Sequence, residues 1–177
     1  MTSDRIMPDL HEDDVEEVAQ LRRLLAGWRV TSLLKQKDIT AKAGLGDTVV
    51  SCMERGDAGP MRLINVCRYA SVFGLAVAVS FEGMPVPVFT PELESLDTLS
   101  KANPFNPLWL ETFIVKYLRE CRKQQGVELK VLAARLNMRL DTLSKWELEG
   151  TDPHLYRMMD YARQLGGRMK LGLVLVP

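Results

Sequence analysis

The chain repeats itself after 93 residues, and this repeat limits its possible folds more than any other feature. Seven positions agree in chemistry without a gap when the chain is shifted by 93 places, and the match continues after one gap. The matched positions are Leu25 with Leu118, Arg29 with Arg122, Ile39 with Leu132, Val50 with Leu143, Ser51 with Ser144, Glu54 with Glu147, Pro60 with Pro153, and, after the gap, Tyr69-Ala70 and Phe73-Gly74 with Tyr161-Ala162 and Leu165-Gly166. Two copies of one small unit therefore fit the sequence better than a single larger domain.

The repeat divides the chain into two predicted domains and a linker. The expected bounds are 1–82 for the first domain, 83–107 for the linker and 108–177 for the second domain. A chain of 177 residues is long enough for two small domains. Five prolines interrupt regular structure in the linker, although the stretch from Pro91 to Ser100 has the spacing of a short helix with three leucines on one side.

Apolar residues recur at steps of three and four in both copies, which predicts four short helices in each. In the first copy they are expected after the acidic residues of 11–14, around Ile39 and Ala43, at about 47–55 and at about 61–73. In the second copy they are expected at about 107–125, 130–136, 140–147 and 153–165. The turn before each third helix falls at Gly44 and Asn137, which tolerate a left-handed backbone. The apolar stripe of the first helix is expected to be Val15, Val18, Leu21, Leu25 and Trp28.

Each copy ends in a short run that follows a glycine and is typical of a β-strand. The runs are 75–81 and 169–176. A lone strand leaves unpaired backbone groups along its edges. We therefore expect the two strands to pair with each other or with strands of a second molecule.

Composition excludes several classes of protein. The three cysteines, Cys52, Cys67 and Cys121, lack any C-x-x-C spacing and are expected to be buried thiols, and with only two histidines we expect no metal site. No apolar run approaches the roughly 18 residues that span a bilayer, and the N-terminus lacks a secretory signal, so we expect no membrane partner and a cytoplasmic location. No phosphate loop or catalytic constellation is recognisable, which predicts neither an enzyme nor a cofactor.

Charge is balanced overall but unevenly distributed. The chain has 23 basic and 23 acidic residues. Residues 21–82 hold nine bases and five acids, and residues 114–177 hold twelve bases and seven acids. Positive charge therefore gathers in both copies, as a nucleic-acid partner requires. The acidic start, with seven acids and one base in residues 1–20, is interpreted as a solvated helix rather than a partner-binding or DNA-mimicking strip.

Both copies resemble the Cro/repressor (XRE) family of helix-turn-helix proteins, the second copy more clearly. In the first copy the resemblance rests on Arg29, Gln36, Ile39-Thr40, Ala43-Gly44-Leu45, Ser51 and Glu54-Arg55-Gly56. In the second it rests on Arg122, Leu132-Ala133-Ala134-Arg135-Leu136-Asn137-Met138, Ser144-Lys145-Trp146-Glu147 and Gly150. The second copy departs from the pattern at Leu129, where the first has Gln36. The resemblance implies a mainly α fold of two lambda-repressor-like bundles, each ending in a short β-strand.

A helix-turn-helix places the third helix of each copy in the major groove of double-stranded DNA. The expected DNA contacts of the first copy are Lys35, Gln36, Asp47, Thr48, Ser51 and Arg55. Those of the second copy are Lys130, Arg139, Leu140, Asp141, Thr142, Ser144 and Lys145. For Asp47 and Asp141, capping of a helix is an equally good interpretation.

Other noticeable residues are expected to be structural. The family resemblance implies one ion pair in each copy, Arg29 with Glu54 and Arg122 with Glu147, rather than contacts with DNA. The side chains expected in the core are Trp28, Met53, Trp146, Met158 and Met159.

The leading hypothesis is a sequence-specific transcriptional repressor in which one chain supplies two reading modules. The arrangement resembles phage immunity repressors, including mycobacteriophage ones that act as monomers on asymmetric operators, and this implies a bacterial host cytoplasm. The half-sites are expected to differ, and repression is expected to occur by occlusion of RNA polymerase. The alternative is an antitoxin or adaptor with one DNA-binding module and one protein-binding module, an interpretation that the weakly basic third helix of the first copy favours.

Overall fold

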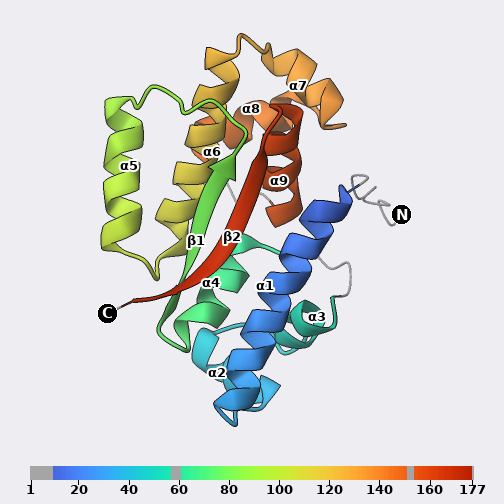
Figure 1. Ribbon diagram of the computed structural model, residues 1–177, viewed down its shortest axis with the longest axis vertical. Coiled ribbons are helices and arrows are strands. Elements are labelled where there is room, and N and C mark those ends of the chain that lie inside the picture. The colour runs from blue at the N-terminus through green and yellow to red at the C-terminus, as the bar shows by residue number, and fades with distance from the viewer. Residues whose placement is uncertain (1–9, 57–60, 151–153, 177) are drawn as a thin grey trace.

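In the part of the chain that the structure describes, two sets of four helices are each followed by one strand, and one further helix lies between the two sets in the sequence (Figure 1). The structure is a computed structural model that describes residues 10–56, 61–150 and 154–176. The elements of the first half are α1 (Glu12–Thr31), α2 (Gln36–Ala43), α3 (Val49–Arg55), α4 (Leu63–Ser71) and β1 (Leu75–Glu82). After α5 (Pro91–Ala102) come α6 (Pro107–Gln124), α7 (Leu129–Arg135), α8 (Leu140–Glu149), α9 (Leu155–Gln164) and β2 (Arg168–Leu175). The fold is thus mainly helical with one small sheet, and the predicted helices and strands are present.

Local sequence explains where the short helices begin and end. The α2 helix starts at a capping box, in which the Asp38 carboxylate accepts a hydrogen bond from the backbone N–H of Lys35 at 2.7 Å. It ends at Gly44, whose φ of 61° is left-handed. The corresponding turn in the second half is made by Asn137 with a φ of 49°. Both turn predictions are therefore confirmed, since these residue types adopt such a φ at least cost.

The predicted apolar stripe of α1 is only partly correct. Val18, Leu21 and Leu25 are buried, but the side chains of Val15 and Trp28 are 44% and 39% exposed. Steps of four, three and four from Asp14 lead through the three buried residues, so Val15 and Trp28 lie at the margins of the buried face. Trp28 is consequently not a core residue.

The two strands pair with each other within one chain, which confirms the first of the two predicted arrangements. They run antiparallel, with Leu75 opposite Leu175 and Glu82 opposite Arg168. The strands cross the middle of the molecule between α6 and α1 (Figure 1). The ring of Phe81 on β1 stacks on Tyr117 of α6 with a centroid distance of 4.4 Å. The two halves are therefore joined by side-chain packing as well as by the backbone pairing of the strands.

The proline-rich stretch 83–107 holds an ordered helix. Helix α5 starts with Thr90 as N-cap and Pro91 in its first turn, and it packs against α6. Leu93 and Leu96 are buried in this contact, which confirms the helix predicted there. The stretch is therefore not an extended tether, because burial of these leucines holds α5 against the second half.

The acidic start of α1 is not simply solvated, which corrects that interpretation. Asp14 is buried and accepts two hydrogen bonds of 2.8 Å from Arg163 of α9. Glu17 lies 3.1 Å from the Lys170 ammonium and accepts a hydrogen bond from the backbone N–H of Leu171 at 2.8 Å. These acids join α1 to the last helix and strand of the second half, an arrangement that charge counting along the sequence does not reveal.

Candidate nucleic-acid interface

Helices α7 and α8 form a helix-turn-helix in the second half. Leu132 and Leu143 are fully buried and hold the pair together from inside. The turn between them is closed by a hydrogen bond of 2.9 Å from the N–H of Met138 to the carbonyl of Ala133. Because Leu143 faces the core, the opposite side of α8 faces solvent, and Asp141 there is exposed.

A buried ion pair fixes α8 to its neighbours. The Arg122 guanidinium of α6 donates to both carboxylate oxygens of Glu147, with distances of 2.7 and 2.6 Å. The same carboxylate accepts a hydrogen bond of 2.6 Å from the hydroxyl of Tyr161 on α9. Hydrogen bonding to Glu147 raises the pKa of Arg122, and burial followed by the nearby carboxylate raises the pKa of Tyr161. The expected ion pair is confirmed, and it sets the position of α8 relative to the bundle.

The first half contains the same arrangement. Arg29 donates to both oxygens of Glu54 at 2.6 and 2.8 Å, and the Tyr69 hydroxyl donates to Glu54 as well. Burial alone would raise the pKa of Glu54, but hydrogen bonds from Arg29, Tyr69 and Gln36 outweigh it and hold the pKa below its ordinary value. The second expected ion pair is therefore also confirmed.

The residues predicted to contact DNA in the second half lie together along α8 and the start of α7. Arg139 is the N-cap residue of α8, and its side chain is 86% exposed. Three of the bases are close to acids, namely Arg139 to Asp141 at 4.0 Å, Lys145 to Glu149 at 3.8 Å and Lys130 to Glu128 at 2.9 Å. All three pairs are largely exposed, and exposed ion pairs contribute little to stability. Leu140 and Thr142 are also exposed, and Ser144 is half-buried.

The predicted contacts of the first half are less uniform. Thr48 is the N-cap of α3 and is exposed, as are Lys35, Asp47 and Arg55. The Ser51 hydroxyl donates to the carbonyl of Thr48 at 3.1 Å. Since Thr48 is the N-cap, the alternative that Asp47 caps α3 is not the arrangement found. In the second half Asp141 lies in the first turn of α8, after the Arg139 cap.

Gln36 differs from the other predicted contacts because its amide is engaged inside the protein. The Nε2 group donates to Glu54 at 2.8 Å. The sequence places Leu129 at the equivalent position of the second half, where no such bond is possible. Gln36 is thus the third residue, after Arg29 and Tyr69, that donates a hydrogen bond to the Glu54 carboxylate.

Sequence reasoning did not include Lys37, an exposed base at a position equivalent to that of the predicted contact Lys130. Lys37 lies 93 positions before Lys130 and, like it, is the second residue of its helix and exposed. The repeat itself contained this signal, because the same shift that aligns Arg29 with Arg122 aligns these two lysines.

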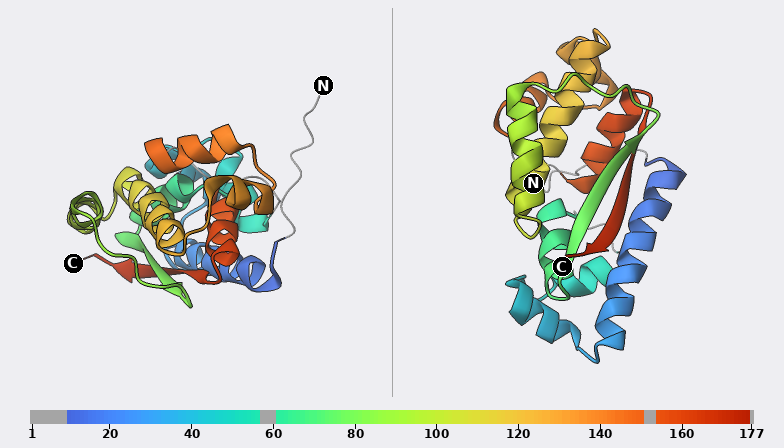
Figure 2. Two further views of the ribbon diagram at one scale, coloured as in Figure 1. Left: turned by 90° about the horizontal axis from the view of Figure 1, so that it is seen from above. Right: turned by 60° about the vertical axis from the view of Figure 1, so that its left-hand side comes forward.

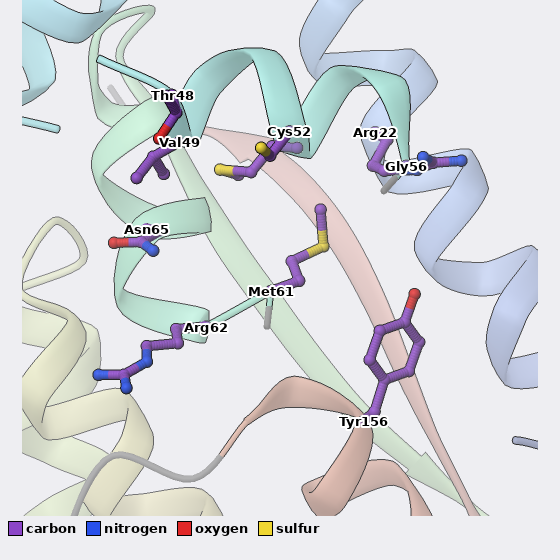
Figure 3. A pocket seen from close by; sticks show the side chains of 10 residues that line it. Arg22, Thr48, Val49, Cys52, Gly56, Met61, Arg62, Asn65 and Tyr156 are labelled. Carbon is purple, nitrogen blue, oxygen red and sulfur yellow. The ribbon is translucent and has the colours of Figure 1, made fainter. Parts of the chain in front are cut away.

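A cavity of about 270 Å³ lies beside α3, where α1, α4 and α9 converge (Figure 3). Its wall includes Thr48 and Cys52 of α3, Arg22 of α1 and Tyr156 of α9. Close to it, the backbone N–H of Leu155 donates to the carbonyl of Met61 at 3.0 Å. Helix α3 therefore lies close to the place where the first half contacts the second half through Met61 and Leu155.

Comparison with known protein families supports the helix-turn-helix assignment of the second half. Residues 118–170, from the middle of α6 into β2, match the family model described as Helix-turn-helix. The match supports a DNA-binding transcription regulator of the XRE kind. No curated protein and no solved structure matches the chain.

Two further observations concern membrane-spanning helices and metal-binding groups. None of the helices in the described ranges combines the length and the apolar character needed to cross a bilayer. Across the same ranges, no group of three or more His, Cys, Asp or Glu side chains is placed to hold a metal ion.

Proposed function

We propose that the chain is a sequence-specific repressor that binds double-stranded DNA through two helix-turn-helix modules, 1–82 and 108–177, joined by 83–107. The observation that carries the proposal is the doubled Arg–Glu–Tyr arrangement. In each half an arginine of the first helix and a tyrosine of the fourth hold a glutamate of the third. In the half that matches the helix-turn-helix family, this arrangement positions α8, and by analogy it would position α3 as a second reading helix.

The proposed target is an asymmetric site bound by one chain. Residues at equivalent positions of α3 and α8 differ, with Asp47 against Leu140 and Cys52 against Lys145. Different side chains at the base edges select different bases, so the two half-sites should not be identical. A protein bound across a promoter in this way would repress by excluding RNA polymerase, as in the phage immunity repressors that the sequence resembles.

An antitoxin or adaptor is the second candidate function, with the first half binding a protein. One observation favours it, namely the exposed apolar side chains of Leu24 and Trp28 in α1 and of Leu33 just after this helix. The acidic residues of α1 do not support it, because Asp14 and Glu17 are engaged with the second half.

Selection from random duplex DNA with the full chain tests the proposal. The selected duplex is then bound at two salt concentrations and the complex is sized by light scattering. One chain on an asymmetric site, with affinity falling steeply as salt rises, is the expected result. No enrichment of any sequence would refute DNA reading altogether, and two chains on a palindrome would refute the single-chain arrangement.

Point variants separate the two candidate functions better than truncation does. Deleting residues 1–82 would remove β1, the only described partner strand of β2, so loss of binding could reflect loss of folding. We therefore compare Lys35→Ala with Lys145→Ala, and use Lys101→Ala on α5 as an exposed control. The two-module repressor loses affinity with both substitutions, by about 1–3 kcal/mol where the contact is to a base. The adaptor loses affinity only with Lys145→Ala.

A further inference from the structure

The register of the two strands contains information about how the two halves are related. Residues of the fourth helices and strands are equivalent at a shift of 92, as Tyr69 and Tyr161 illustrate. In the sheet, Val79 lies opposite Leu171, and these two residues are also 92 positions apart. Equivalent strands that pair antiparallel at equivalent residues are related by a twofold axis through that pair, because a simple translation would leave them parallel.

A second pair of equivalent residues lies on the same kind of axis. Arg62 and His154 form an isolated antiparallel bridge, and their numbers again differ by 92. They precede α4 and α9, whereas the strands follow these helices, so the two pairs are separated by a helix layer. Two independent pairs therefore place an approximate twofold axis between the halves, from the sheet to the bridge.

The axis places both third helices on one side of the molecule. Seen from above, the strands lie along one side and α8 lies on the opposite side (Figure 2, left). A rotation about the twofold axis leaves each element at the same distance from the sheet, measured along that axis. The helix equivalent to α8, which is α3, therefore lies on the same side of the molecule as α8. Duplex DNA has twofold axes of its own, perpendicular to the helix, and a twofold pair of reading helices matches half-sites that run in opposite directions.

We infer that the chain reads an imperfect inverted repeat at a single spacing, and not a direct repeat. The inference rests on the proposed two-module function and adds to it the orientation and phase of the half-sites. The repeat is imperfect because the reading residues differ, as Thr48 against Asp141 illustrates, while Ser51 and Ser144 are the same.

The single spacing follows from the contacts that join the halves. Eight residue pairs connect β1 to β2. On one flank, Arg163 binds Asp14 at 2.8 Å and Lys170 binds Glu17 at 3.1 Å. Buried side chains from both halves also form one continuous core. Such contacts resist rotation of one half against the other, whereas a single inserted base pair turns a half-site by about 34–36°.

The test uses the full chain and a set of duplexes built from the selected site. One half-site stays fixed, and the other is placed in inverted or direct orientation at spacings that change by one base pair over a full helical turn. Affinity is measured by fluorescence anisotropy, and the number of chains per duplex by light scattering. We expect the tightest binding for the inverted orientation at one spacing, with a loss of at least about tenfold after a two-base-pair insertion.

Three results would overturn the inference. Equal affinity for a direct repeat, or affinity that does not depend on spacing, would show that the halves move independently while leaving two-module reading intact. A lone half-site bound as tightly as any pair would overturn it and the two-module function together, leaving a one-module regulator. The absence of any selected site would overturn DNA reading itself.

A variant provides the matched control. The substitution Lys145→Ala is expected to weaken the dependence on orientation and spacing, because the exposed face of α8 then contributes less. The control Lys101→Ala should keep the full dependence. If Lys145→Ala left the orientation dependence unchanged while lowering affinity, α8 would not be the reader of the second half-site.

Discussion

Replacing Glu147 with alanine tests whether the buried ion pair holds α8 in the position needed for DNA reading. The substitution removes the acceptor of two hydrogen bonds from Arg122 and of one from the Tyr161 hydroxyl. The side chains of Arg122 and Glu147 are 11% and 5% exposed, so water cannot fully replace the lost partner. The arginine is left as a buried, uncompensated charge.

The expected magnitude follows from this geometry. Removing one partner of a buried pair costs about 3–5 kcal/mol of unfolding free energy. For a chain of this size, each kcal/mol shifts the melting temperature by roughly 2–4 °C, which gives a fall of roughly 6–20 °C. The double variant Arg122→Met with Glu147→Met should recover part of the loss, because no charge is then left buried.

Thermal unfolding followed by circular dichroism measures these shifts, with Lys101→Ala as the control. Lys101 pairs with Asp97 at 2.6 Å, but its side chain is 74% exposed, so its removal should cost no more than about 1 kcal/mol. A melting temperature for Glu147→Ala as high as that of the control would refute the reasoning. A double variant less stable than Glu147→Ala would show that the arginine charge is not the source of the loss.

Three further predictions concern pH, the contact between halves and the thiols. Because the pKa of Glu54 is held below its ordinary 4.5, its stabilisation is present above that pH and is lost as pH falls through the lowered value. Urea midpoints of Glu54→Gln should therefore fall less between pH 6 and pH 3 than those of the wild type, and parallel pH dependences would contradict this. Asp14→Asn should lower the unfolding free energy by about 1–3 kcal/mol, since Arg163 loses a charged acceptor in a buried site; a urea midpoint that does not move would show that this contact contributes nothing. Burial raises the pKa of Cys67 to about 12, so in native protein at pH 8 a thiol reagent should modify the less buried Cys52 first, and rapid labelling of Cys67 would contradict its burial.

Much of the fold and part of the candidate site could be predicted from the sequence alone. Residue patterns predicted the helix spacing and the left-handed turns at Gly44 and Asn137, and the family resemblance implied the Arg122–Glu147 pair. The spacing and the turns depend on backbone preference and apolar periodicity, which act over a few positions. The order of the elements along the chain therefore follows from local sequence.

The tertiary structure decided how the units meet. The pairing of β1 with β2, the packing of α5 on α6 and the binding of Asp14 by Arg163 join residues far apart in the chain. Local periodicity shows that a surface or strand edge needs a partner, but not which of several compatible surfaces will cover it. That choice depends on the shape and charge of the assembled halves. The tertiary structure also determined that Trp28 would remain half-exposed and that Arg62 would form an antiparallel bridge with His154.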